Sequence, residues 1–104
     1  MNSKIIIVPL LLLWVAQLGV SQNRIEGAVK DAASNEALVG ASIYISDLKM
    51  GVSTDADGHF SIDNLKSGTY LFEISFVGYK TEVLRMGVSQ DTVIAILLDP
   101  SVSD

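Results

Sequence analysis

From residue 22 onward, apolar and polar side chains alternate in short runs, the period of two that is typical of β-strands with one buried face. In segment 24–30, Ile25, Gly27 and Val29 share one side of the predicted strand. The same alternation recurs in segment 41–47. The strands that this pattern predicts cover residues 24–30, 41–47, 51–54, 59–63, 69–76, 80–86 and 91–98.

Glycine, asparagine and aspartate separate these segments at intervals of about 8–12 residues, and no helical period interrupts them. This spacing predicts an all-β fold, a seven-stranded β-sandwich with Greek-key connections. Segments 51–54 and 59–63 flank a turn and are predicted to pair as a hairpin, and a second turn is predicted at 64–68. Segment 91–98 is apolar on both faces, which is typical of a strand that is central in its sheet or covered.

The first 21 residues differ from the rest. One positive charge at Lys4 precedes an uninterrupted apolar run over residues 5–16, and small residues lie ahead of Gln22. These are the parts of a secretory signal peptide, whereas a membrane-spanning helix needs about 20 apolar residues. We therefore expect a helical signal peptide over 1–21 and no membrane span in the exported chain. A β-sandwich domain follows over 22–99, and a polar tail or the start of a linker over 100–104.

Composition narrows the classes of partner and cofactor. The chain has 12 acidic and 7 basic side chains, and no basic patch that would neutralise the phosphates of a nucleic acid. It has no cysteine, which excludes disulfides and thiolate metal sites. We expect no nucleic-acid partner and no cofactor.

The acidic segment 51–60, with the sequence GVSTDADGHF, is open to three interpretations, of which calcium binding is the first. If Gly58 stands at the sixth position of an EF-hand loop, Asn64 stands at the twelfth. That position requires a bidentate carboxylate, which asparagine cannot supply. Catalysis is the second interpretation, but His59 is the single histidine and no nucleophile with an orienting carboxylate is evident around it.

The third interpretation is a turn. Asp55 and Asp57 are expected to accept hydrogen bonds from backbone N–H groups, and Gly58 is expected to adopt a positive φ. His59 then begins a strand as an exposed residue, and Phe60 enters the core. We predict a turn here, with no catalytic residue and no metal ligand.

The glycines, turn residues and core aromatics of residues 24–99, taken in order, resemble the carboxypeptidase-regulatory-like domain. That family has a transthyretin-like sandwich of seven strands, an immunoglobulin-like architecture without a catalytic set. The first strand matches at Gly27 and Val29. The remaining structural turn and core positions that match are Gly40, Thr54, Asp55, Asp57, Gly58, Phe60, Gly68, Tyr70, Gly78 and Tyr79.

This resemblance implies a location and a role. In bacteria such a domain follows the signal peptide of TonB-dependent outer-membrane receptors of the SusC/RagA type, which import nutrients with a surface lipoprotein. The chain is too short to close a membrane barrel by itself, so transport by this chain alone is excluded. The resemblance implies a non-enzymatic module in the periplasm or outer membrane of a Gram-negative bacterium, in contact with the receptor plug, the barrel or the lipoprotein complex.

Two alternatives remain. The chain could be a free-standing exported module that binds a surface polysaccharide or an envelope protein, with Tyr44 and Tyr79 as contact residues, although each tyrosine also suits a structural or scattered surface position. It could instead support an attached enzyme, as the family name implies. No peptidase zinc motif of the H-E-x-x-H type occurs, so in that case it would contribute only scaffold.

Overall fold

The structure, a computed structural model, describes residues 22–101, so the predicted signal peptide over 1–21 lies outside the described residues. The described chain contains strands and no α-helix, and hence no helix suited to crossing a membrane. The strands are β1 (Gln22–Asp31), β2 (Ser42–Ile45), β3 (Met50–Ser53), β4 (His59–Lys66), β5 (Gly68–Ser75), β6 (Glu82–Val88) and β7 (Thr92–Leu98).

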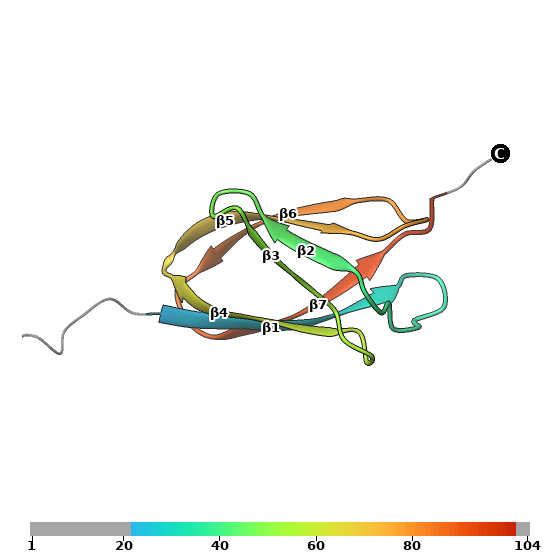
Figure 1. The fold of residues 1–104 in the computed structure, drawn as a ribbon, viewed down its shortest axis with the longest axis horizontal. Coiled ribbons are helices and arrows are strands. Elements are labelled where there is room, and N and C mark those ends of the chain that lie inside the picture. The colour runs from blue at the N-terminus through green and yellow to red at the C-terminus, as the bar shows by residue number, and fades with distance from the viewer. Residues whose placement is uncertain (1–21, 102–104) are drawn as a thin grey trace, which may run out of the picture.

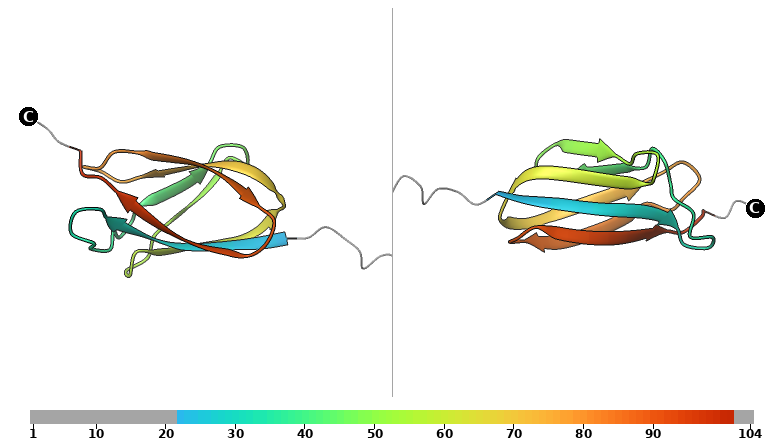
Figure 2. Two further views of the ribbon diagram at one scale, coloured as in Figure 1. Left: turned by 180° about the vertical axis from the view of Figure 1, so that it is seen from behind. Right: turned by 90° about the horizontal axis from the view of Figure 1, so that it is seen from below.

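These strands form two packed sheets, which Figure 1 shows as two layers. The three-stranded sheet has the order β4-β1-β7, and the four-stranded sheet has the order β3-β2-β5-β6. β1 and β7 run parallel, and every other pair is antiparallel. The predicted seven-stranded β-sandwich is therefore confirmed, and the two views in Figure 2 show the sheets from behind and from below.

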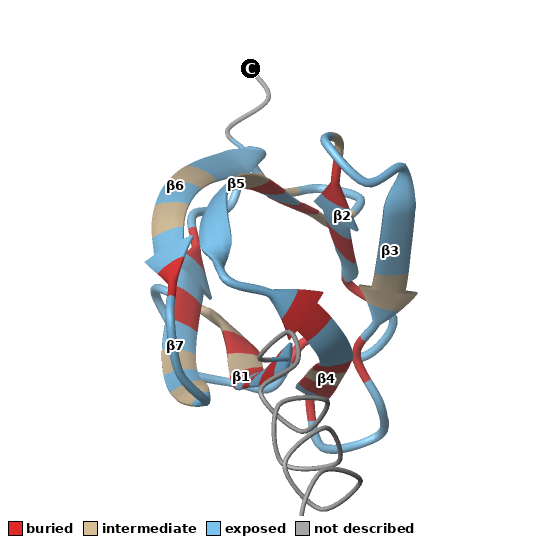
Figure 3. Cartoon of the chain, turned by 90° about the vertical axis from the view of Figure 1, so that its left-hand side faces the viewer, coloured by how far each residue is buried: buried red, intermediate tan, exposed pale blue. Residues whose placement is uncertain are grey.

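The core lies between the sheets and follows the alternation of the sequence, as the banded burial of the strands in Figure 3 shows. Along β1, Ile25 and Val29 are fully buried, whereas Arg24 and Glu26 face solvent. The buried hydrophobic residues form one cluster, made of Ile25, Val29, Leu38, Ala41, Ile43, Ile45, Phe60, Ile62, Leu65, Phe72, Ile74, Val88, Ile96 and Leu98.

The predicted hairpin between the third and fourth strands is wrong, because β3 and β4 belong to different sheets. Two sets of backbone hydrogen bonds explain the separation. Thr54, directly after β3, bonds with Ala41 and keeps β3 beside β2, whereas the carbonyl of Gly58 accepts from Val29 and starts β4 beside β1. The turn thus carries the chain from one sheet to the other.

The predicted turn over 64–68 is also wrong in extent, since β4 continues to Lys66 and β5 begins at Gly68. Leu65 is buried, and its carbonyl accepts a hydrogen bond from the side chain of Asn23 at 3.1 Å. Asn64 adopts a φ of 60°, and the register of β4 against β1 shifts nearby. The polar residues therefore form an irregularity within a strand, not a loop.

The prediction that the last strand is central or covered is wrong as well. β7 pairs only with β1 among the described strands and lies at the edge of its sheet. Its outward side chains are exposed, Val93 by 80% and Leu97 by 53%. Apolar residues on both faces indicate burial on average, but they do not distinguish a covered strand from an uncovered apolar edge.

Candidate functional site

The connection from β3 to β4 begins at Thr54, a buried residue whose side chain forms hydrogen bonds with the connection between β1 and β2. The Thr54 hydroxyl donates to the carbonyl of Leu38 at 2.5 Å and accepts from the N–H of Ala41 at 2.9 Å. The backbone of Thr54 bonds to Gly40 and Ala41 as well. Since buried polar groups must be paired, this one side chain sets the path of the connection between β1 and β2.

Asp55 forms the turn itself. Its Oδ1 accepts hydrogen bonds from the backbone N–H groups of Asp57 and His59, both at 2.9 Å. The bond from His59, followed by that from Asp57, holds the pKa of the Asp55 carboxyl below its usual range, because both stabilise the charged form. The carboxylate of Asp57 accepts no hydrogen bond from another described residue, so only Asp55 acts as the backbone acceptor that was expected of the pair.

Gly58 and Phe60 complete this segment. Gly58 has a φ of 76°, and a Cβ at its position would lie 2.9 Å from the Cβ of Ala37. Phe60 is buried, and its ring covers Gly27 so closely that a Cβ on Gly27 would approach it to 2.6 Å. Both glycines are therefore required by the close packing of the chain around the turn.

Asp55, Asp57 and His59 are the described residues that come closest to a metal site. Each offers one ligand atom, these atoms lie within 4.8 Å of one another, and all three residues are exposed. One oxygen of Asp55 is already occupied by two backbone N–H groups. The imidazole of His59 makes no hydrogen bond to another described residue, so no nucleophile or orienting carboxylate is joined to it for catalysis.

A second group of hydrogen bonds lies where the β5–β6 connection meets the end of β1. The Tyr79 hydroxyl donates to Asp31 Oδ2 at 2.5 Å, and Asp31 Oδ1 accepts from the N–H groups of Ala33 and Ser34. The hydrogen bond from Tyr79 is the main cause that lowers the pKa of Asp31, and the same bond raises the pKa of Tyr79. The Tyr79 ring also packs at 5.7 Å from that of Phe76.

The other predicted motif residues are spread along the sandwich. Gly40 and Gly78 adopt φ values of 84° and 89° in connections, with open space where a side chain would stand. Gly68 opens β5, and the hydroxyl of Tyr70 donates to the carbonyl of Lys66 at 2.6 Å. The structure thus brings Thr54, Asp55, Asp57 and Gly58 together in the connection between β3 and β4, with Phe60 at the start of β4. The remaining motif residues lie in β5 or in other connections.

Two polar residues of β1 have roles that the sequence did not reveal. Asn23 is 4% exposed and donates to Leu65 and Ser67. Arg24 bonds to Ser61 at 3.0 Å and pairs with the carboxylates of Glu26 and Asp63, at the exposed surface of the three-stranded sheet. Apart from Glu26, the partners of these side chains lie in β4 or directly after it, about forty residues along the chain, so no local pattern could indicate those contacts.

The comparison with known families gives one match that spans most of the chain. A profile of the CarboxypepD_reg-like domain matches residues 25–103. Among curated proteins, TonB-dependent receptor P26 from Formosa agariphila is 30% identical over 73 residues, which cover 70% of this chain. The match spans about 7% of the length of that receptor.

Solved structures share the fold at low sequence identity. A chain of a type II cohesin-X-dockerin complex from Acetivibrio cellulolyticus is 21% identical with a TM-score of 0.63, covering 73% of this chain and 56% of its own. A streptococcal ancillary pilin is 18% identical with a TM-score of 0.65, covering 79% and 30%. A Bacteroides uniformis protein described as carbohydrate-binding is 13% identical with a TM-score of 0.59, covering 75% and 41%. These likenesses show the fold alone.

Proposed function

Because the chain belongs to the CarboxypepD_reg-like domain family, we propose that it is a non-enzymatic, exported accessory module that acts by protein–protein contact within a TonB-dependent outer-membrane nutrient receptor. The observation that carries this proposal is the 30% identity with a segment of TonB-dependent receptor P26. The signal-peptide pattern of residues 1–21 supports an envelope location.

The site geometry supports a module that is not an enzyme. The side chains of Thr54 and Asp55 are bonded to the backbone of the same domain, where they hold the connection between β3 and β4 in place. Catalysis would need a nucleophile and a base within hydrogen-bond reach in a cleft. In the described chain His59 is exposed and bonds to Asp55 only through its backbone N–H, not through its imidazole ring.

A chimeric receptor tests this function. The matched 73-residue segment of receptor P26 is deleted, and in a second strain it is replaced by the β-sandwich domain of this chain. We expect the deletion to reduce nutrient uptake, and the replacement to restore it at an equal amount of receptor in the outer membrane. A replacement carrying the core-disrupting change Phe72→Asp is the control and should behave as the deletion does. The proposal fails if the folded domain restores nothing.

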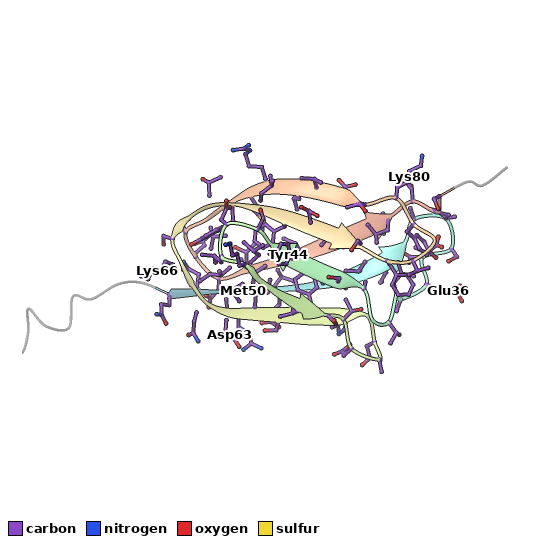
Figure 4. All side chains as sticks on the ribbon, turned by 45° about the horizontal axis from the view of Figure 1, so that its top comes forward. Glu36, Tyr44, Met50, Asp63, Lys66 and Lys80 are labelled. Carbon is purple, nitrogen blue, oxygen red and sulfur yellow. The ribbon has the colours of Figure 1, made fainter. Side chains whose placement is uncertain are left out.

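The second candidate function is a free-standing module that binds a surface polysaccharide. It is favoured by Tyr44, which is 40% exposed on the outer face of the four-stranded sheet (Figure 4), and by the shared fold with a protein described as carbohydrate-binding. Titration of the chain with envelope polysaccharide, beside a Tyr44→Ala variant, tests it. Equal binding or no binding by the two proteins removes this candidate.

A further inference from the structure

The outer edge of β7 presents backbone groups that are free among the described residues. The carbonyl of Leu98 accepts from Ala32, on the β1 side, whereas the carbonyl of Asp99 accepts from Lys80, on the opposite side. Because N–H and C=O groups alternate in direction along a strand, those of Val93, Ala95 and Leu97 point away from β1. No hydrogen bond within residues 22–101 pairs them across that edge.

Exposed apolar side chains lie beside these backbone groups. Val93 and Leu97 are among the most exposed large hydrophobic residues of the described chain. Across the opening between the two sheets, β6 contributes Leu84, and a groove of about 160 Å³ is lined by Glu82, Leu84, Ala95, Ile96 and Leu97. The half-buried Leu84, Met86 and Ile94 pack against the core from this side. Figure 3 shows β6 and β7 on the same side of the sandwich.

The other sheet edges are protected and β7 is not. β3 is only four residues long, β4 carries charges and the irregularity at Asn64, and β6 carries Glu82 and Arg85. Short length, charge and irregular backbone are the usual means by which proteins block strand addition. β7 has seven residues, none of them charged. An open apolar edge of this kind is the template that strand-addition complexes use.

The charges near this edge indicate which kind of strand can bind to it. Glu82 lines the groove, and the exposed Asp91 precedes β7 and accepts a hydrogen bond from the N–H of Arg24 at 2.8 Å, so acidic groups lie along this part of the sheet. An antiparallel second copy centred on Ala95 would place Asp91 of one chain opposite Asp99 of the other, between chains that each carry a net charge of −5. Like charges directly opposite destabilise a strand pair. A partner strand with basic ends avoids this repulsion.

We propose that the free edge of β7 binds an extended segment of a partner protein by strand addition, and that this segment alternates apolar residues between lysine or arginine at its ends. This inference rests on the proposed function, since it specifies the surface and the type of partner segment for the proposed protein–protein contact. The bound segment pairs with the backbone of Val93, Ala95 and Leu97 and covers the groove beside Leu84.

Titration of the isotope-labelled full chain with synthetic peptides tests the proposal. The probe is a nine-residue peptide that alternates valine and threonine between terminal lysines. We expect its addition to shift the amide resonances of Val93, Ala95 and Leu97 and to slow their hydrogen exchange. A peptide with N-methylated backbone nitrogens on alternate residues should not bind, and one with terminal glutamates should bind roughly tenfold more weakly.

Two matched lysine variants test whether the peptide binds at the edge of β7. Val93→Lys places a charge on the open edge, whereas Val39→Lys makes the same change at an exposed position in the β1–β2 connection. We expect Val93→Lys to weaken peptide binding by roughly tenfold and Val39→Lys to leave it unchanged. Equal effects of the two variants overturn the proposal, as does equal binding of the N-methylated or glutamate-ended peptide.

Other occupants give different results. Concentration-dependent dimers with protected Val93, Ala95 and Leu97 amides in the absence of peptide would show that a second copy fills the edge. Binding that appears only in a chain lacking residues 1–21 would show that this segment fills it. Either result overturns the proposal. If the chimeric receptor needs the domain but tolerates Val93→Lys, the strand-addition inference fails while the proposed function stands.

Discussion

Replacing Thr54 separates the contribution of its hydroxyl from that of its methyl group. The hydroxyl bonds to both Leu38 and Ala41 in a buried setting, where the residue is 5% exposed. Thr54→Val keeps the shape and removes both bonds, which leaves the buried N–H of Ala41 without its partner. Thr54→Ser keeps the hydroxyl and removes one methyl group.

The two variants are expected to lower the free energy of unfolding by clearly different amounts. A typical hydrogen bond contributes about 0.5–1.5 kcal/mol, and a buried donor left unpaired costs about 1–3 kcal/mol, so Thr54→Val should lower the free energy of unfolding by roughly 2–4 kcal/mol. The lost methyl of Thr54→Ser should cost about 1 kcal/mol. At about 4–8 °C per kcal/mol for a domain of this size, the valine variant should melt at least roughly 10 °C below the wild type.

Thermal and urea unfolding followed by circular dichroism measure both variants. The m-value should stay unchanged, which shows that the variants unfold from the same compact state. If Thr54→Val is no more destabilising than Thr54→Ser, the hydroxyl of Thr54 does not hold the β1–β2 connection in place.

Three further predictions follow from the turns. Gly58→Ala should cost roughly 2–4 kcal/mol in urea unfolding and Gly40→Ala only about 1–2, since both positions have positive φ but only Gly58 lacks space for a Cβ; equal losses would contradict this. The folded-state pKa of Asp31 lies below its ordinary value of 3.8, so its contribution to stability is present above that value and is lost as the pH falls through the folded pKa. Urea unfolding between about pH 5 and about pH 2 should show a shallower acid loss for Tyr79→Phe, and an unchanged slope would refute the coupling. Zinc or calcium should leave the melting temperature unchanged, and a rise that His59→Ala abolishes would overturn the prediction that Asp55, Asp57 and His59 bind no metal.

The strands could be predicted because their cause is local. Alternation of apolar and polar residues identifies which side of a strand is buried, and Ile43, Ile45, Phe72 and Ile74 lie in the core as the pattern indicates. The positive φ of Gly58 has the same local origin, since a sharp reversal beside Asp55 needs a residue that tolerates this conformation.

The pairing of the strands could not be predicted, because it depends on contacts between distant residues. The segment around Gly58 has every feature of a hairpin turn, yet a bond from Val29, almost thirty residues earlier, assigns β4 to the other sheet. Likewise, the partners of Asn23 and Arg24 become visible only when β1 lies beside β4. Local patterns determine which face of a strand is buried, whereas long-range packing determines its neighbours.

The use of hydrogen-bonding groups in this fold suits the proposed role in protein–protein contact. Thr54, Asp55, Asp31 and Asn23 direct their side chains to the backbone of their own domain, and no buried polar side-chain atom of the described chain lacks a partner. Groups engaged in this way are not available to bind or activate a substrate. The open main-chain groups of the β7 edge are available, because an edge strand keeps one row of N–H and C=O groups free. Recognition by this domain is therefore expected to proceed through backbone pairing, with specificity set by the acidic groups near this edge and the apolar groove beside it.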